Sequence, residues 1–292
     1  MGRVRRAIAI ATVGSFVFAA LVLPGVASAK PPAGTQKSKV FSGTPTVGAL
    51  FESATSGKHF CTASVVASPG GNVLMTAAHC IQGSAKGLSF APGFHDGTAP
   101  FGRWTVTGAY FDPAWISEGN TTRDFAFLTV APRQLRGIPT DIQTVTGANV
   151  LSTKPSSGES VTVPAYPDGQ AKVPITCTAK VYFEGIYPAF NCNPYIGGTS
   201  GSPWLEPTSE GVMVVGLIAG LHQGGCFTYT SYSPPLGSDA RAVYNRAVAG
   251  AKPEIGPEQL AWLKKDVARF HKSTPIVVFT HRPLFDLRPD WE

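Results

Sequence analysis

The residues best suited to chemistry lie in the glycine-rich stretch GGTSGSP, residues 197–203. Glycine lets a backbone come close to another group, because a side chain there would block the approach. A serine among glycines can therefore present its hydroxyl and nearby backbone N–H groups to one point. Attack on a carbonyl needs this convergence, since the alcohol and the donors to the resulting oxyanion must meet at one carbon. Gly/Ser/Thr/Pro clusters are also common in surface loops, so the stretch alone does not establish a nucleophile.

A nucleophilic serine needs a base and a group that orients the base. His79 lies in the stretch TAAHC, residues 76–80, at the predicted end of a strand. A lone His beside a Cys can also be structural or bind a metal, but no second Cys/His pair has the spacing of a zinc site. Asp124 opens the apolar stretch DFAFL, residues 124–128. Most such Asp residues form turns or caps, but one that leads into a buried strand needs a polar partner, and an imidazole N–H suits it.

Many short strands must position these residues. The 292 residues are 43% hydrophobic and 14% charged, with 32 glycines and 25 prolines, which favours an all-β fold with a sizeable core. The polar connection 131–141 divides the strand-like stretches into two sets, which predicts a sandwich or barrels, and a helix over 239–249 closes the domain. The stretches are 60–66, 73–75, 104–110, 125–130, 161–165, 175–183, 204–205 and 212–219.

The first 29 residues have the pattern of a secretory signal peptide. A start with three arginines precedes the apolar residues 7–23, and ASA at 27–29 supplies a cleavage site. The apolar stretch is short and interrupted by polar residues, which argues against a membrane anchor. We therefore expect a secreted protein without membrane contact after cleavage. The polar residues 30–45 are predicted to form a tail or a short pro-segment.

Export makes the five cysteines candidates for disulfides. Cys61 and Cys80 lie at the ends of neighbouring strand-like stretches, and Cys177 and Cys192 flank a predicted hairpin. Cys226 is then left over, and it could instead pair with Cys192, because sequence alone does not fix connectivity. The formal net charge is +6, but three of the arginines lie in the signal segment and no Lys/Arg cluster is interleaved with aromatic residues. These features argue against nucleic-acid binding.

Three motifs occur along the chain in the order His–Asp–Ser: TAAHC, an Asp before an apolar strand, and GTSGSP. In this order they resemble the trypsin/chymotrypsin superfamily of serine peptidases, and most closely its secreted bacterial, glutamyl-endopeptidase-like (V8-like) branch with the pattern G-x-S-G-S-P. The resemblance places the peptidase domain at residues 46–250. It implies two antiparallel six-stranded β-barrels with the active site in the cleft between them.

The resemblance also implies a role for each residue. His79 would be the general base toward the nucleophile Ser200, and Asp124 would hold the imidazole tautomer. The N–H groups of Gly198 and Ser200 would form the oxyanion hole. Ser202 is the rival nucleophile, but it matches the second glycine of the usual G-D-S-G-G-P pattern. The implied enzyme is a serine endopeptidase that acts on proteins or peptides through an acyl-enzyme, as a monomer and without a metal or cofactor.

Three departures from the family pattern concern activation and specificity. Thr199 stands where the trypsin-like pattern has an Asp that pairs with a newly cut N-terminus, so we expect no zymogen switch of that type. No acid occurs at 193–195, which leaves a preference for Lys or Arg unsupported. Ile218 matches the position of the histidine with which the bacterial enzymes bind glutamate. The residue before the cleaved bond (P1) is therefore predicted to be uncharged, with His222 and Gln223 at the pocket rim or in a polar loop.

The tail, residues 251–292, differs in character from the β-rich domain. An amphipathic helix at 256–270 precedes an apolar strand at 275–279, and the region resembles a piece of the calcineurin-like metallophosphoesterases. His281 matches a metal ligand of that family, but its other ligand motifs are absent, and one ligand cannot make a two-metal site. We therefore predict a non-functional fragment.

One alternative belongs to another functional class. A catalytically inactive, peptidase-like binding module would keep the fold and the cleft but lose the chemistry. The presence of all three triad residues argues against it. A metal-dependent phosphoesterase, the third hypothesis, lacks its ligands.

Overall fold

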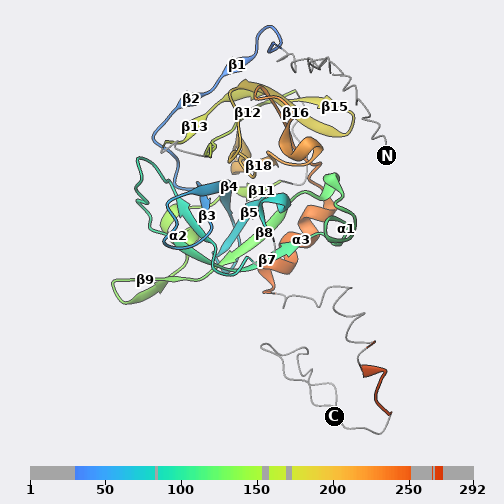
Figure 1. Ribbon diagram of the computed structural model, residues 1–292. Helices are drawn as coiled ribbons and strands as arrows, with labels where there is room; N and C mark the ends of the chain where they lie inside the picture. The colour runs from blue at the N-terminus through green and yellow to red at the C-terminus, as the bar shows by residue number, and fades with distance from the viewer. Residues whose placement is uncertain are drawn as a thin grey trace, which may run out of the picture. The chain divides into compact units, whose positions relative to one another are not determined.

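The computed structural model describes residues 30–82, 85–152, 158–168, 173–250, 265 and 267–271. Every element below lies in the compact unit that begins at Pro31 (Figure 1). The predicted signal segment 1–29 and nearly all of the tail 251–292 fall outside the described residues. None of the helices within the described ranges is long and apolar enough to cross a membrane.

The first strand set is a closed barrel. Its six strands follow one another around the barrel in the order β3-β4-β5-β8-β7-β6. All residues of β3, β5 and β8 are buried, so these strands are covered on both faces. Closure leaves no exposed strand edge in this half of the domain. The strands are β3 (Val47–Phe51), β4 (His59–Val66), β5 (Val73–Thr76), β6 (Ser89–Pro92), β7 (Trp104–Phe111) and β8 (Ala126–Val130).

The second strand set consists of two sheets around a separate core that contains Phe190 and Trp204. One sheet has the order β11-β18-β17-β12-β14, and in the other β16 pairs with β1, β15 and β19. Several of its strands are only two or three residues long, and the ladder is not continuous around the core. They are β11 (Val150–Leu151), β12 (Ser160–Thr162), β14 (Thr178–Lys180), β15 (Tyr182–Glu184), β16 (Tyr187–Asn193), β17 (Pro203–Thr208), β18 (Gly211–Leu217) and β19 (Thr230–Tyr232).

Short elements connect and flank these sets. The predicted divider 131–141 carries the hairpin of β9 (Arg133–Leu135) and β10 (Ile138–Thr140). The final helix, α3 (Ser238–Val248), packs against β7 and β8, and its Ala240, Val243 and Ala247 are buried. The other short helices are α1 (Pro113–Glu118), α2 (Ile142–Thr146) and the 3-10 turns η1 (Ala78–Cys80), η2 (Thr121–Arg123) and η3 (Leu221–Gly224).

The segment before the first barrel runs along the second strand set (Figure 1). Within the stretch 30–45, β1 (Gln36–Lys37) pairs in parallel with β16, and β2 (Lys39–Val40) pairs with β13 (Ile175–Thr176). The stretch that the sequence predicts as a tail or pro-segment therefore adds two short strands to the fold. The side chains of these two strands remain exposed, and the pairing is made by the backbone.

Two disulfides join the pairs that the sequence favours. Cys61–Cys80 connects β4 to η1 in the first barrel, and Cys177–Cys192 connects the residue between β13 and β14 to β16. Cys226 is a free, exposed thiol, so the alternative pairing with Cys192 does not form.

Candidate active site

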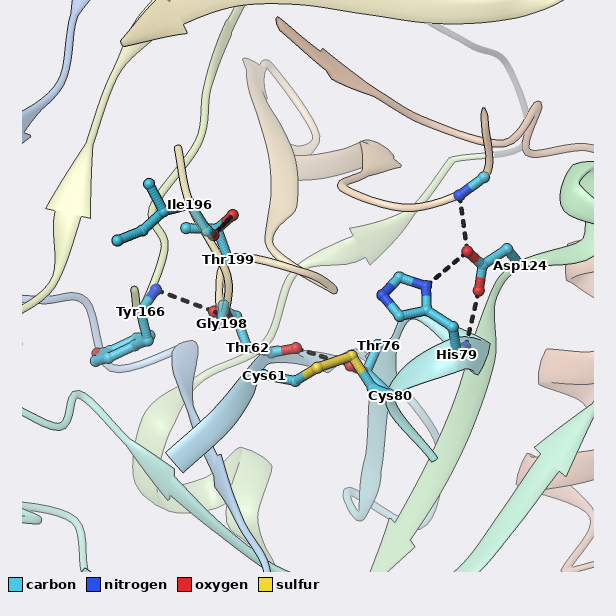
Figure 2. The surroundings of a disulfide bond; sticks show 11 residues. Cys61, Thr62, Thr76, His79, Cys80, Asp124, Tyr166, Ile196, Gly198 and Thr199 are labelled. Atoms are coloured by element: carbon cyan, nitrogen blue, oxygen red, sulfur yellow. Dashed lines mark hydrogen bonds and ion pairs between the residues drawn. A yellow bond between two sulfur atoms is a disulfide. The ribbon is translucent and has the colours of Figure 1, made fainter. Parts of the chain in front are cut away.

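His79 and Asp124 form a hydrogen-bonded pair at one end of the first barrel (Figure 2). His79 lies in η1 directly after β5, and the disulfide of Cys80 ties this turn to β4. Its Nδ1 is 2.7 Å from Oδ2 of Asp124, and its backbone N–H donates to Oδ1 at 2.9 Å. The two bonds to one carboxylate fix both the backbone and the ring of the histidine.

Asp124 is fully buried and lies two residues before β8. A third donor, the N–H of Gly220, lies 2.8 Å from Oδ2. Three N–H groups thus satisfy a carboxylate that would be costly to bury unpaired. Because an ionised carboxylate only accepts hydrogen bonds, Nδ1 of His79 carries a proton and Nε2 is left as the acceptor. The pair therefore presents a base at Nε2.

Ser200 and His79 line the same cavity, which has a volume of about 560 Å³. Ser200 lies in the turn between β16 and β17 and is partly accessible, whereas Ser202 is fully buried with an unpaired Oγ. Ser200 is therefore the more accessible of the two serines. His79 and Ser200 both belong to the described residues, and no hydrogen bond joins Nε2 of His79 to Oγ of Ser200. In free enzymes such bonds are often long, and they tighten when substrate binds.

Two glycines of the turn are required by its geometry. Gly198 has φ +84°, and a Cβ there would lie 2.2 Å from the backbone nitrogen of Asp168. Gly201 has φ +81°, and a Cβ there would lie 2.2 Å from the carbonyl oxygen of Thr62. Both positions combine a left-handed backbone with close approach to another backbone segment, so only glycine fits without strain.

The N–H groups of the turn divide into two groups. Those of Thr199, Gly201 and Ser202 donate to the carbonyls of Ile196, Ile218 and Thr199, respectively. Among the described residues, no hydrogen bond is made by the N–H of Gly198 or Ser200. These are the two N–H groups that the family resemblance predicts for the oxyanion hole.

The described lining of the cavity includes two histidines, His79 and His222, but no Asp, Glu, Lys or Arg. Ile218 is buried in the wall, and His222 and Gln223 belong to the lining, both with left-handed backbones (φ 52° and 55°). Burial raises the pKa of the neighbouring Tyr195 hydroxyl, which donates to the carbonyl of Val163.

A second histidine, His59, is buried on the first barrel. Its Nε2 lies 2.7 Å from the carbonyl oxygen of Pro167, and the rings of Phe51, Phe94 and Tyr166 surround it. Burial lowers its pKa below 6.5, and the bond to Pro167 and the charge of Asp168 offset only part of this effect. His59 is therefore neutral near pH 7 and donates from Nε2.

Three contributors to the site carry no recognisable sequence signal. The N–H of Gly220 bonds Asp124, the N–H of Asp168 bonds the carbonyl of Gly197 at 2.7 Å, and the hydroxyl of Thr62 donates to the carbonyl of Gly198. Two of the three act through the backbone, which any residue type supplies. Only Thr62 acts through its side chain. It lies next to Cys61, and no sequence motif marks it.

Three solved peptidase structures are similar to this chain in fold. The protease Anisep from Arthrobacter nicotinovorans is 23% identical with a TM-score of 0.61, covering 73% of this chain and 99% of that chain. The thermostable serine protease AL20 from an extremophilic microorganism is 24% identical (TM-score 0.58; 70% and 98% covered). A Glu endopeptidase in complex with MPD is 21% identical (TM-score 0.58; 74% and 98% covered).

At these identities the solved structures establish the chymotrypsin-like fold of two β-strand sets. No curated protein matches the sequence significantly. The sequence model of the trypsin-like peptidase domain matches residues 61–217, which is more than half of the chain and includes His79, Asp124 and Ser200. The chain therefore belongs to the trypsin-like peptidase family, a family of serine endopeptidases.

Proposed function

We propose that this peptidase is secreted and that it hydrolyses peptide bonds through a triad of His79, Asp124 and Ser200. The observation that carries the proposal is the buried Asp124 carboxylate, which holds Nδ1 of His79 at 2.7 Å and leaves Nε2 as a base in the cavity that Ser200 lines. We assign the peptidase domain to residues 46–250, with a signal peptide at 1–29 and a non-functional fragment at 251–292.

The reaction follows from this arrangement in two halves. In the first, Oγ of Ser200 attacks the substrate carbonyl while Nε2 of His79 takes its proton, and the same proton then passes to the leaving amine. The oxyanion of each tetrahedral intermediate accepts hydrogen bonds from the N–H groups of Gly198 and Ser200. In the second half, His79 takes a proton from the water that attacks the acyl-enzyme and returns it to Oγ of Ser200 as the bond to the acyl group breaks and the carboxylic acid product leaves. Asp124 stays ionised and stabilises the imidazolium.

The cavity supports an uncharged residue at P1. The described walls contain no carboxylate that could pair with a Lys or Arg at P1. They also contain no Lys or Arg that could pair with a Glu at P1, and Ile218 contributes an apolar surface. Placing a charged side chain against such walls would cost desolvation free energy without a partner. The substrate class is therefore proteins or peptides cleaved after uncharged residues.

Two observations support export. The described domain contains two disulfides, which persist in oxidising compartments. The sequence pattern of residues 1–29 is that of a signal peptide, and it lies outside the described residues. Comparing the N-terminus of protein recovered from the culture medium with the ASA site at 27–29 tests this part of the proposal.

The test of the mechanism is labelling with a fluorophosphonate, which needs an activated serine, together with casein hydrolysis. We expect both in the wild type and neither in Ser200→Ala, which removes the nucleophile but little volume. Ser202→Ala is the matched control and should keep most of the activity, because its Oγ has no partner. A wild type that neither reacts nor hydrolyses would favour the inactive binding module. Activity that EDTA abolishes and a metal restores would contradict the triad mechanism.

A further inference from the structure

We propose that Thr62 is a positioning residue that holds the 197–200 turn in the orientation required for oxyanion binding. The proposal rests on the triad function given above. It concerns a side chain of the first barrel that acts on the nucleophile turn of the second strand set (Figure 2).

Every polar group of Thr62 is bonded near this turn. Its Oγ1 donates to the carbonyl of Gly198 at 3.0 Å and accepts from the N–H of Tyr166 at 3.0 Å. Its backbone N–H donates to the carbonyl of Ser200 at 2.8 Å, and its own carbonyl accepts from Oγ1 of Thr76 at 2.7 Å. Thr62 is fully buried, so water does not compete for these bonds.

These bonds act on the oxyanion donors through peptide geometry. In a trans peptide the C=O and the following N–H point in opposite directions. The bond from Asp168 to the carbonyl of Gly197 therefore turns the N–H of Gly198 the other way, and the bond from Thr62 to the carbonyl of Gly198 fixes the next peptide. Because the same Thr62 hydroxyl accepts from Tyr166, it also anchors the segment that carries Asp168. One hydroxyl thus controls both sides of Gly198.

The turn does not obtain this anchor from its own side chains. The hydroxyl of Thr199 donates to the carbonyl of Ile196 at 2.7 Å, within the turn itself. Without the Thr62 hydroxyl, the buried carbonyl of Gly198 and the N–H of Tyr166 would each lose a partner. The loss at Tyr166 would loosen the segment whose Asp168 N–H holds the carbonyl of Gly197, and this 197–198 peptide carries the N–H of Gly198. The N–H of Gly198 would then no longer be held in the oxyanion position.

The experiment compares Thr62→Val, which keeps the shape but removes the hydroxyl, with Thr62→Ser, which keeps the hydroxyl. Thr146→Val is the matched control, because Thr146 is buried in α2 and its Oγ1 donates to the carbonyl of Ile142 at 2.9 Å. The measurements are kcat and KM on a peptide nitroanilide taken from the wild-type cleavage profile, and the affinity for the corresponding peptide aldehyde, whose adduct places an oxygen in the oxyanion hole.

We expect Thr62→Val to lose about 10- to 100-fold in kcat, less than the removal of an oxyanion donor, with KM within about twofold. Aldehyde affinity should fall in step with kcat, while Thr62→Ser and Thr146→Val stay near the wild type. A Thr62→Val enzyme with wild-type kcat, a loss confined to KM, or a Thr62→Ser enzyme as impaired as Thr62→Val would each overturn the proposal.

Folding failure is also decisive. If Thr62→Val does not fold, Thr62→Ala replaces it, and failure of both variants while Thr62→Ser folds would show that the hydroxyl is structural, which overturns a positioning role. A wild type that the fluorophosphonate does not label refutes the triad function itself. An active wild type with an unaffected Thr62→Val refutes only the role of Thr62.

Discussion

Asp124→Asn is the substitution whose effect the structure defines most closely. Asp124 accepts three N–H bonds, with Oδ2 bonded to Nδ1 of His79 and the N–H of Gly220, and Oδ1 bonded to the N–H of His79. An amide has one acceptor oxygen in place of two. Whichever way it is turned, its NH₂ group must face at least one N–H donor.

The two amide orientations have different consequences. With its oxygen at the Oδ2 position, the new side chain would keep two bonds and leave the N–H of His79 unpaired. With its oxygen at the Oδ1 position, its NH₂ would face Nδ1 and draw the imidazole into the tautomer with the proton on Nε2, which cannot act as the base. Loss of the negative charge weakens catalysis in the first case, and the wrong tautomer costs about 10⁴-fold in the second. We therefore expect kcat to fall by about 10³- to 10⁴-fold.

The assay is casein or nitroanilide hydrolysis together with the rate of fluorophosphonate labelling, and thermal unfolding shows whether the variant is folded. The unpaired buried donor should cost about 1–3 kcal/mol of unfolding free energy. Asp112→Asn is the control, since Asp112 accepts the N–H of Ala114 at the start of α1, away from the cavity. A folded Asp124→Asn enzyme that loses less than about tenfold in kcat would refute the reasoning, because the bonds to His79 would then not set the base.

Three further predictions concern disulfides, pH and specificity. Replacing either cystine by two alanines should cost about 3 kcal/mol of unfolding free energy. At temperatures where both variants are folded, loss of Cys61–Cys80, which lies beside the histidine turn, should lower kcat more than loss of Cys177–Cys192. Equal kcat values in the two folded variants would contradict this. Because burial lowers the pKa of His59, the unfolded chain binds more protons than the folded protein below pH 6.5. The free energy of unfolding should therefore decrease as the pH falls through and below that value, and it should decrease less steeply in His59→Gln. Identical slopes of unfolding free energy against pH, measured by urea titration, would count against this prediction. Cleavage of a peptide library should show uncharged P1 residues, and a dominant Glu, Lys or Arg signal would overturn our interpretation of the cavity.

The parts of the fold that the sequence predicts are those in which residue type is constrained. Gly198 and Gly201 are needed for a left-handed backbone against another segment, and this need is visible as a glycine pattern. The strand-like stretches of the first barrel coincide with observed strands, because their apolar residues fill a closed core. The polar stretch 30–45 is harder to interpret, since β1 and β2 form through backbone pairing to strands far along the chain.

The same distinction applies to the candidate site. His79, Asp124 and Ser200 can be predicted because each role admits few residue types. The donors from Gly220 and Asp168 cannot be predicted, because every residue except proline carries a backbone N–H and only the tertiary fold decides where it points. A single sequence therefore allows a prediction of the reacting side chains but not of the backbone groups that would orient them.

The distance between the histidine and the serine depends on how the two halves of the domain are joined, because each half carries one of them. Two hydrogen bonds of 2.8 Å link the halves on either side of the pair: Thr62 N–H to the carbonyl of Ser200, and Gly220 N–H to Oδ2 of Asp124. The first bond ties the turn that carries Ser200 to β4. The second ties Gly220, which follows β18, to Asp124, the residue that is hydrogen-bonded to His79. Thr62→Val keeps the backbone bond to Ser200 but removes the hydroxyl bond to the carbonyl of Gly198, and Asp124→Asn removes at least one of the bonds that hold His79 or Gly220. We expect non-additivity between the two substitutions in kcat, since both act through the geometry of one reacting centre.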